Sequence, residues 1–316
     1  MSTLITGMHH VTAMASGAQS NLDFYTGVLG LRLLKQTVNF DAPDVYHFYY
    51  GNEVGDPGTI MTFFPFAQMA RGRKGRSQTV RTSFSVPEGA LEFWMERLRR
   101  FGIGFTQPEE RFNEQFIYFE DWDGLGLELV AHAGDTRQPF SRPFIPESVA
   151  IRGFHHVELS ERVYEATEEL LVNMLDYDFV GESGARRRYA PRTGSTGFLD
   201  LVWDAHPDFG SGGTGTVHHI AFDTASEEDQ LILRERLLRR KVFTTQVLDR
   251  QYFKSIYFRE PGGVLFEVAT SGPGFAWDEP VAALGQELKL PPWVEAQRAA
   301  IEAQLEQINQ DMTKYA

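Results

Sequence analysis

An internal repeat constrains the fold of this 316-residue chain more than any other feature. The segment GMHHV at residues 7–11 recurs as GFHHV at residues 153–157. Two further segments, which begin at Val80 and Val217, start related units and lead into strongly helical stretches. Repetition of this kind indicates that each unit is one supersecondary motif that packs against its neighbours. The pattern predicts an α+β fold of four βαβββ modules, near residues 7–66, 79–132, 153–204 and 217–270.

The proline-containing link at residues 133–152 separates the modules into two halves. We therefore expect one domain at residues 1–140, a second at residues 150–272, and a C-terminal tail at residues 273–316. The tail is predicted to contain a helix, because its apolar residues follow one stripe at helical spacing. We expect that stripe to pack on the body of the protein or on another subunit. It consists of Trp293, Ile301, Leu305, Ile308 and Met312.

Composition narrows the classes of partner. The formal net charge of −13 argues against nucleic acid. Because the chain has no cysteine, disulfides, thiolate metal sites and cysteine nucleophiles are excluded. No apolar stretch reaches the roughly 18 residues that a membrane-spanning helix needs, and the N-terminus shows no secretion signal. We expect a cytoplasmic homo-oligomer.

The basic run at residues 71–76 is interpreted as a solvated loop, with an oligomer contact as the alternative.

The repeat offers eight equivalent positions for metal ligands. A carboxylate inside an apolar strand is costly unless it is paired or bound to a cation. Two imidazoles and one carboxylate form the ligand set of non-heme Fe(II) oxygenases, which leaves coordination positions open for substrate and O2. The first strands contribute His10, Thr82, His156 and His219, and the last strands contribute Thr62, Glu128, Asp200 and Glu267.

A site built from two modules can combine these positions in three ways. Sequence spacing alone does not choose between the pairing of the first module with the fourth and the pairing of the third module with the fourth. Three histidines, His47, His132 and His206, stand outside the pattern and are interpreted as ordinary polar residues. The first and fourth modules give His10, His219 and Glu267; the third and fourth give His156, His219, Glu267 and Asp200; the second and third give His156, Glu128 and Asp200.

Four motifs carry a resemblance to a known family. They are GMHHVT at 7–12, VHHIAF at 217–222, Asp249-Arg250 leading to SIYF at 255–258, and EPGGVLFE at 260–267. The chain resembles the vicinal-oxygen-chelate superfamily of glyoxalases, bleomycin-resistance proteins and extradiol dioxygenases. Within it, the chain is most similar to hydroquinone ring-cleaving dioxygenases. The resemblance implies two glyoxalase-like domains of two modules each.

The resemblance also implies the roles of individual residues. The metal ligands would be His10, His219 and Glu267, and the metal would be Fe(II), with Mn(II) as the alternative. Supporting or substrate-facing roles would fall to His9, Thr12, His218, Arg250 and Tyr257. The implied function is an Fe(II)-dependent ring-cleaving dioxygenase that acts on hydroquinone- or catechol-type aromatic diols with O2.

Two other functions stay open at this point. One is a metal-dependent isomerase or transferase of the glyoxalase type, and the other is a non-catalytic protein that binds an aromatic ligand. The isomerases of this superfamily resemble a four-ligand design, whereas the first module here ends in Thr62, which offers no carboxylate. The missing fourth ligand favours O2 activation over isomerisation.

The geometry of the last hairpin can be predicted from its loop. If residues 261–263 form a three-residue loop, Tyr257 lies opposite Glu267 and on the same face of the sheet. A loop of two or four residues would turn Tyr257 away. In a regular strand, His9 and His218 would point to the face opposite the ligands. They therefore need a twist or a bulge to reach the site.

Overall fold

The computed structural model describes residues 3–194, 196–203 and 208–316, and it confirms the four predicted modules. In each module the last strand pairs in parallel with the first. Module 1 consists of β1 (Gly7–Ala15), α1 (Ala18–Leu22), the π-helical η1 (Asp23–Val28), β2 (Arg32–Asn39), β3 (Ala42–Gly51) and β4 (Ile60–Pro65). Module 2 consists of β5 (Gln78–Val86), α2 (Leu91–Arg100), β6 (Glu109–Arg111), β7 (Glu114–Glu120) and β8 (Gly126–Ala131).

The second half of the chain repeats the same order of elements. Among the described residues, no helix is long and apolar enough to cross a membrane. Module 3 consists of β9 (Gly153–Glu161), α3 (Glu165–Met174), β10 (Tyr177–Ser183), β11 (Arg186–Pro191) and β12 (Phe198–Trp203). Module 4 consists of β13 (Thr216–Thr224), α4 (Glu227–Arg239), β14 (Leu248–Asp249), β15 (Lys254–Arg259) and β16 (Leu265–Thr270).

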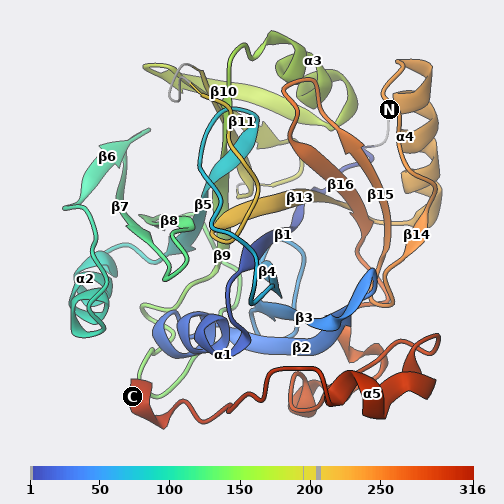
Figure 1. The fold of residues 1–316 in the computed structure, drawn as a ribbon. Helices are drawn as coiled ribbons and strands as arrows, with labels where there is room; N and C mark the ends of the chain where they lie inside the picture. The colour runs from blue at the N-terminus through green and yellow to red at the C-terminus, as the bar shows by residue number, and fades with distance from the viewer. Residues whose placement is uncertain (1–2, 195, 204–207) are drawn as a thin grey trace.

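Two eight-stranded sheets unite the modules across the two halves of the chain (Figure 1). One sheet has the order β14-β15-β16-β13-β1-β4-β3-β2 and joins modules 1 and 4. The other has the order β10-β11-β12-β9-β5-β8-β7-β6 and joins modules 2 and 3. The proposed domains at residues 1–140 and 150–272 follow the chain order, whereas each sheet takes one module from each of them. A site inside either sheet is therefore shared between the halves.

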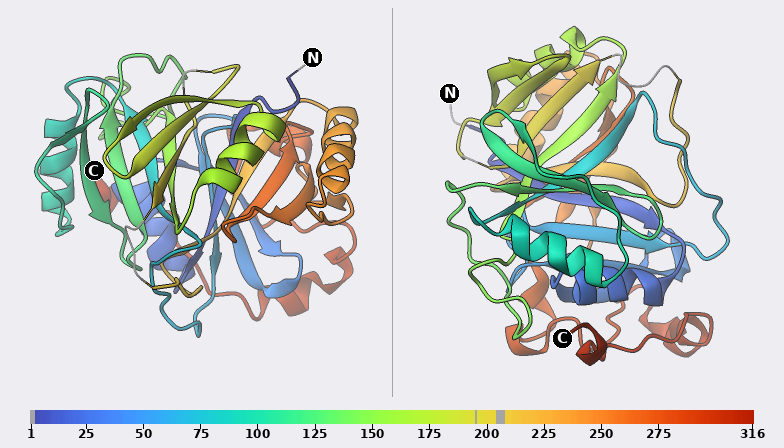
Figure 2. Two further views of the ribbon diagram at one scale, coloured as in Figure 1. Left: turned by 90° about the horizontal axis from the view of Figure 1, so that it is seen from above. Right: turned by 90° about the vertical axis from the view of Figure 1, so that its left-hand side faces the viewer.

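The C-terminal tail runs along one side of the molecule, next to β2 and α1 (Figures 1 and 2). The predicted helix is present but short, and Trp293 of the predicted stripe is 50% exposed. Hydrogen bonds to module 1 replace helical ones here: the Gln19 side chain binds both the N–H and the carbonyl of Asn309, at 2.6 and 3.0 Å. The tail elements are η2 (Phe275–Trp277), η3 (Val281–Ala283), η4 (Glu295–Gln297), α5 (Arg298–Glu302) and η5 (Thr313–Tyr315).

The basic run at residues 71–76 is a loop in which Arg71 and Arg73 are exposed, as interpreted, but its backbone is paired with another loop. Its backbone forms bridges with residues 209–214. The two segments approach so closely that a Cβ on Gly75 would lie 2.4 Å from the Gly210 nitrogen. Backbone pairing between two glycine-containing loops therefore fixes this segment, and sequence charge alone gave no sign of it.

A buried pair of carboxyl groups joins module 3 to the last hairpin of module 4. Glu161 and Glu260 are 1% and 2% exposed, and each lies within hydrogen-bond distance of the Thr167 hydroxyl, at 2.9 and 2.5 Å. One hydroxyl donates one hydrogen, so the second contact requires a proton on one carboxyl group. Glu260 also accepts hydrogen bonds from the N–H groups of Gly262 and Val264, which favours its ionised form. Burial and the charge of Glu260 raise the pKa of Glu161 to about 8.

The Glu161→Gln variant is expected to lose a pH dependence of stability. Between the ordinary pKa of 4.5 and the raised value of about 8, the folded protein keeps a proton that the unfolded chain has released. The contribution of Glu161 to the free energy of unfolding therefore falls as pH rises through this window, by at most about 1.4 kcal/mol per pH unit. Buried histidines with lowered pKa values, such as His9 and His218, add stability as pH rises in every variant. Urea unfolding at pH 5 and pH 7.5 therefore measures the Glu161 contribution as the difference in pH slope between the wild type and Glu161→Gln. Glu235→Gln, on an exposed side chain, is the control, and equal slopes in all three proteins would contradict the prediction.

Candidate metal centre

The histidine doublets of modules 1 and 4 lie on β-bulges. The register between β1 and β13 skips His9 on one strand and His218 on the other. A bulge re-aims the side chain of the extra residue. The Nδ1 atoms of His9 and His10 lie 2.9 Å apart, and those of His218 and His219 lie 2.7 Å apart. The bulges that the sequence required are therefore present, and each brings the first imidazole of a doublet against the second.

His10, His219 and Glu267 converge from β1, β13 and β16. The Nε2 atoms of the two histidines are 3.3 Å apart. The Oε2 atom of Glu267 lies 3.3 Å from His10 Nε2 and 2.8 Å from His219 Nε2. All three side chains are buried. The first of the open pairings, modules 1 and 4, is thus the one that brings two imidazoles and a carboxylate together on β1, β13 and β16.

The donor atoms of this triad suit a metal ion. Ligands at about 2.0–2.2 Å from a metal, set at right angles, are about 3 Å apart, which is close to the observed separations. Glu267 Oε2 is buried and has only the two imidazole nitrogens close by, neither of which makes a well-aligned hydrogen bond to it, while its Oε1 accepts a hydrogen bond from Ser255. A buried carboxylate oxygen without a partner is costly, so a cation would satisfy it.

The electrostatics favour an ionised Glu267 and a neutral His219. Burial would raise the pKa of Glu267, but His10 and His219 hold it well below its usual range. Burial lowers the pKa of His219. Burial and the neighbouring imidazoles lower the pKa of His9 to about 3 and that of His218 to about 4. A neutral imidazole and an ionised carboxylate are the forms that bind metals.

Tyr257 and Arg250 form one wall beside the triad. Tyr257 pairs with Glu267 across β15 and β16, as the predicted three-residue loop required. The Arg250 Nε donates a hydrogen bond of 3.2 Å to the Tyr257 hydroxyl. Burial and the charge of Glu267 raise the pKa of Tyr257. This wall therefore presents a protonated phenol and a guanidinium, of which the latter lies 3.6 Å from Asp41.

A cavity of about 330 Å³ opens next to the triad. His10 and His219 reach it, and among the predicted supporting residues it is lined by His218, Arg250 and Tyr257. Thr12 and His9 do not line it, so they stand behind the ligands. Most of the remaining wall is apolar, which suits an aromatic ring. The apolar lining consists of Met14, Phe40, Phe64, Phe66, Met69 and Phe253.

Sequence reasoning missed two residues of this cavity, His47 and Tyr49. Both lie on β3, where alternate residues share a face. His47 Nε2 is 3.0 Å from the Thr62 hydroxyl, and Thr62 is 2.8 Å from the hydroxyl of Thr12. Thr62, which occupies the position of a fourth ligand in module 1, therefore holds His47 in place through a hydrogen bond. His206, grouped with His47 by sequence, lies outside the described residues.

The other sheet contains the equivalent positions of modules 2 and 3. One of them is not the residue that the sequence repeat predicted. The β5–β9 register skips Val80 and His155, as the β1–β13 register skips the first histidine of each doublet. The residue after the bulge, Arg81, is therefore the equivalent of His10, and the assignment of Thr82 was wrong by one residue. Local sequence similarity around the segment is too weak to reveal this shift.

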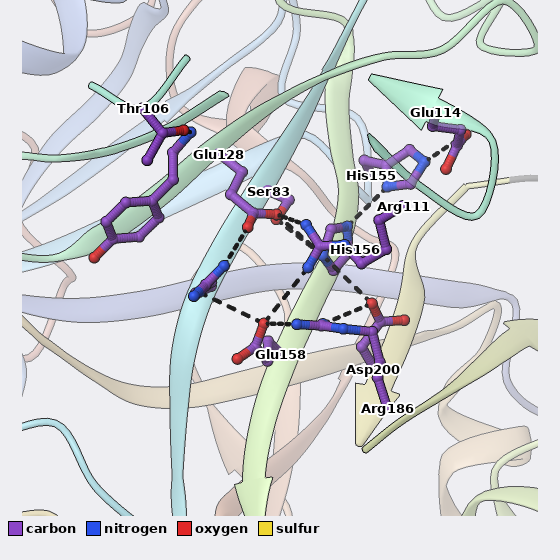
Figure 3. A network of polar contacts seen from close by, with 12 residues as sticks. Ser83, Thr106, Arg111, Glu114, Glu128, His155, His156, Glu158, Arg186 and Asp200 are labelled. Atoms are coloured by element: carbon purple, nitrogen blue, oxygen red, sulfur yellow. Dashed lines mark hydrogen bonds and ion pairs between the residues drawn. The ribbon is translucent and has the colours of Figure 1, made fainter. Parts of the chain in front are cut away.

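Guanidinium groups hold the carboxylates of this second set (Figure 3). Arg81 and Arg111 contact Glu128 at 2.7 and 2.8 Å. Arg186 and Arg188 contact Asp200 at 2.9 and 2.8 Å. His156 lies 3.3 Å from Glu128 and 3.5 Å from Asp200. Fixed cations thus neutralise the carboxylates, so the pairing of modules 2 and 3 has no need of a metal ion.

A third group, next to the second set, combines Glu114, His132 and His155. Glu114 Oε1 lies 2.6 Å from His132 Nδ1 and 3.0 Å from His155 Nε2. Its Oε2 accepts a hydrogen bond of 3.0 Å from Arg188. Burial opposes ionisation of Glu114, but both histidines lower its pKa. Because both carboxylate oxygens already have partners, we assign no ion to this group.

The fold agrees with comparisons to known proteins. The model of the Glyoxalase/Bleomycin resistance protein/Dioxygenase superfamily matches residues 7–129 and 153–268. The chain belongs to this superfamily. A crystal structure of glyoxalase I from Zea mays aligns with a TM-score of 0.61 at 15% identity, over 84% of this chain and 92% of that one. That likeness shows the shared fold.

Relatives of higher sequence identity are dioxygenases by name. "Putative ring-cleaving dioxygenase MhqE" of Bacillus subtilis (strain 168) is 45% identical over 93% of this chain and 96% of the relative. Chlorohydroquinone/hydroquinone 1,2-dioxygenase of Sphingobium indicum is 36% identical over 92% of this chain and 93% of the relative. A crystal structure of a "putative dioxygenase" from Bacillus subtilis aligns with a TM-score of 0.94 at 42% identity, over 98% and 99% of the two chains.

Proposed function

We propose that this protein is an Fe(II)-dependent ring-cleaving dioxygenase that acts on hydroquinone- or catechol-type aromatic diols with O2. The main support for this proposal is a buried set of three potential metal ligands beside a largely apolar cavity: His10, His219 and Glu267. The fourth equivalent position is Thr62, whose hydroxyl is engaged by Thr12 and His47. Relatives named as ring-cleaving dioxygenases support the choice of reaction. We also propose that the protein acts in the cytoplasm.

The residues around the triad have distinct tasks in this proposal. Bound Fe(II) would supply coordination for a phenolate and a route for electrons between the ring and O2. His9 and His218 orient the ligand imidazoles through their Nδ1 contacts. Arg250 places positive charge beside the cavity, where negative charge on a substrate oxygen would develop. Tyr257, hydrogen-bonded to Arg250, holds a proton within reach of the ring oxygens.

The apolar wall completes the arrangement. Phe40, Phe64 and Phe253 restrict water next to the ligands. A restricted, low-dielectric site strengthens the interaction between Arg250 and a substrate anion. An aromatic diol offers a flat apolar face to these rings and polar oxygens to the triad and to Arg250 and Tyr257.

Oxygen consumption tests the proposal. The protein is purified without O2, loaded with Fe(II), and mixed with hydroquinones and catechols before O2 is admitted. We expect uptake of one O2 per ring opened with at least one of the diols. No uptake with any diol would refute the proposal. Turnover with Zn(II), Ni(II) or Mn(II) in the absence of O2 would instead support a glyoxalase-type isomerase or transferase, and tight ligand binding without turnover or metal would support a binding protein.

A further inference from the structure

A chain of four hydrogen-bonded side chains begins at Thr12 on β1, the strand that carries His10, and ends at Tyr49 in the cavity wall. The hydroxyls of Thr12 and Thr62 are 2.8 Å apart. Thr62 is 3.0 Å from His47 Nε2, and His47 Nδ1 is 2.9 Å from the Tyr49 hydroxyl. The first two residues face each other in the β1–β4 register, and Tyr49 faces Thr62 in the β3–β4 register. Sheet pairing therefore fixes the order of the chain.

Ring packing fixes the two members that reach the cavity. The His47 ring packs on Tyr49 and on Phe64, with centroid distances of 4.1 and 4.3 Å. The Tyr49 ring packs on Phe275 of the tail at 5.0 Å. Both His47 and Tyr49 line the cavity. Packing thus holds their polar atoms in place in the cavity wall.

Hydrogen-bond counting gives the chain a direction. A neutral imidazole has one N–H and one lone pair in the ring plane, so His47 donates to one neighbour and accepts from the other. If Tyr49 donated to His47, the hydrogens would run towards Thr12. Thr12 is fully buried, and within the described residues its hydroxyl has no partner besides Thr62. Its hydrogen would then have no acceptor, which costs free energy.

In the opposite direction, the hydroxyl hydrogen without a protein acceptor lies on Tyr49, which is 1% exposed but lines the cavity, where a bound molecule can accept it. Thr12 then donates to Thr62, Thr62 donates to His47 Nε2, and His47 Nδ1–H donates to the Tyr49 oxygen. The hydrogen of the Tyr49 hydroxyl is left over, and it belongs to a side chain that lines the cavity. The chain therefore supplies the cavity with one oriented hydrogen-bond donor.

We propose that Tyr49 donates a hydrogen bond to the substrate oxygen that is not held at the metal, and that His47 and Thr62 position this donor. The inference rests on the proposed function and specifies the substrate: an aromatic ring with a second oxygen across the ring from the first. In an ortho-diol, both oxygens can reach the open side of one metal ion. In a para-diol, the second oxygen must find its partner in the cavity wall.

Equilibrium binding without O2 tests the proposal with three ligands. Hydroquinone and 4-methoxyphenol both carry an acceptor oxygen at the para position, whereas 4-methylphenol has none. In Tyr49→Phe, which removes only the hydroxyl, we expect the Fe(II)-loaded protein to bind the first two ligands about 3- to 10-fold more weakly. Binding of 4-methylphenol should stay within about twofold, because no hydrogen bond is lost. Calorimetry under nitrogen measures all three dissociation constants.

Position 62 tests the chain behind Tyr49. Thr62→Val leaves His47 Nε2 without its donor, which frees His47 to accept from Tyr49 instead. We expect this variant to bind hydroquinone and 4-methoxyphenol more weakly and 4-methylphenol as before. Thr62→Ser keeps a hydroxyl at this position and should bind all three ligands as the wild type does. Tyr50→Phe is the matched control, because Tyr50 donates to Asn21, away from the cavity, and should bind all three ligands as the wild type does. Iron content and the midpoint of thermal unfolding verify that each variant is intact.

The outcomes separate this inference from the proposed function. If the wild type binds the para-oxygen ligands but Tyr49→Phe keeps the same selectivity, the role of Tyr49 is refuted and the proposed function stands. Equal weakening of all three ligands would mean that Tyr49 contacts the metal-held oxygen or acts structurally, and would also refute the role. Failure of the wild type to bind any of the phenols would refute the proposed function and this inference with it.

Discussion

Glu267→Gln is expected to lose bound iron and to reduce diol-dependent oxygen uptake by more than about 100-fold. The variant keeps the size of the side chain and the contact with Ser255, but it removes the negative charge that faces His10 and His219. An amide oxygen is a much weaker ligand for Fe(II) than a carboxylate. Iron analysis of the anaerobically purified protein and an oxygen electrode give the two readouts.

The other sheet provides a matched control for this variant. Glu128 occupies the position in module 2 that Glu267 occupies in module 4, and it is equally buried. Its carboxylate is bound by Arg81 and Arg111. Glu128→Gln is therefore expected to keep the iron and at least half of the oxygen uptake. Loss of iron in both variants, or in Glu128→Gln alone, would contradict the assignment.

The second large effect concerns stability. Arg188→Met is expected to lower the free energy of unfolding by about 3–5 kcal/mol, the range for removing one partner of a buried ion pair. Arg188 is 4% exposed, binds Asp200 through two hydrogen bonds and also reaches Glu114. Its removal leaves two carboxylates short of their cation. Urea unfolding at pH 7 measures the loss.

Two comparisons sharpen the stability measurement. Arg239→Met breaks an exposed pair with Glu235 on α4, and exposed pairs of this spacing contribute less than about 0.5 kcal/mol. Iron content should be unchanged in Arg188→Met, because Arg188 serves the sheet that lacks the triad. A loss of less than about 1 kcal/mol would show that the arginine network does not stabilise modules 2 and 3 as described.

The sequence predicted the fold well because the repeat is a local signal. The first strand of each module can be recognised in the sequence, and hydrophobic alternation places the ligands of modules 1 and 4 on one face. Register is a different matter, because a single skipped residue moves every later side chain. Val80 is such a residue, and it hides the equivalence of Arg81 and His10. No pattern within β5 alone carries that information.

The choice among module pairings could not be made from spacing. His10 and His156 have the same neighbours in sequence, and both lie in buried first strands. What separates them is the partner strand, since β1 pairs with β13 whereas β9 pairs with β5. His47 was missed for a related reason. It lies on β3, outside the repeated motifs, and only the folding of β3 against β4 brings it to the cavity wall and to Thr62.

The tail shows a limit of periodicity. Ile301, Leu305 and Met312 are buried as the stripe predicts, yet α5 spans only residues 298–302. Contacts with module 1 fix the segment beyond α5, as when Glu306 accepts hydrogen bonds from the N–H groups of Ala18 and Gln19. Long-range hydrogen bonds of this kind compete with helix formation, and no local pattern encodes them.

Metal content in two histidine variants tests the central claim most directly. His10 and His156 are homologous, buried and each the second member of a doublet, but only His10 lies with His219 and Glu267. After purification without O2 and loading with Fe(II), the wild type and His156→Ala should each hold one iron per chain, and His10→Ala should hold less than about a tenth of that. Iron lost from His156→Ala and kept by His10→Ala would contradict the account.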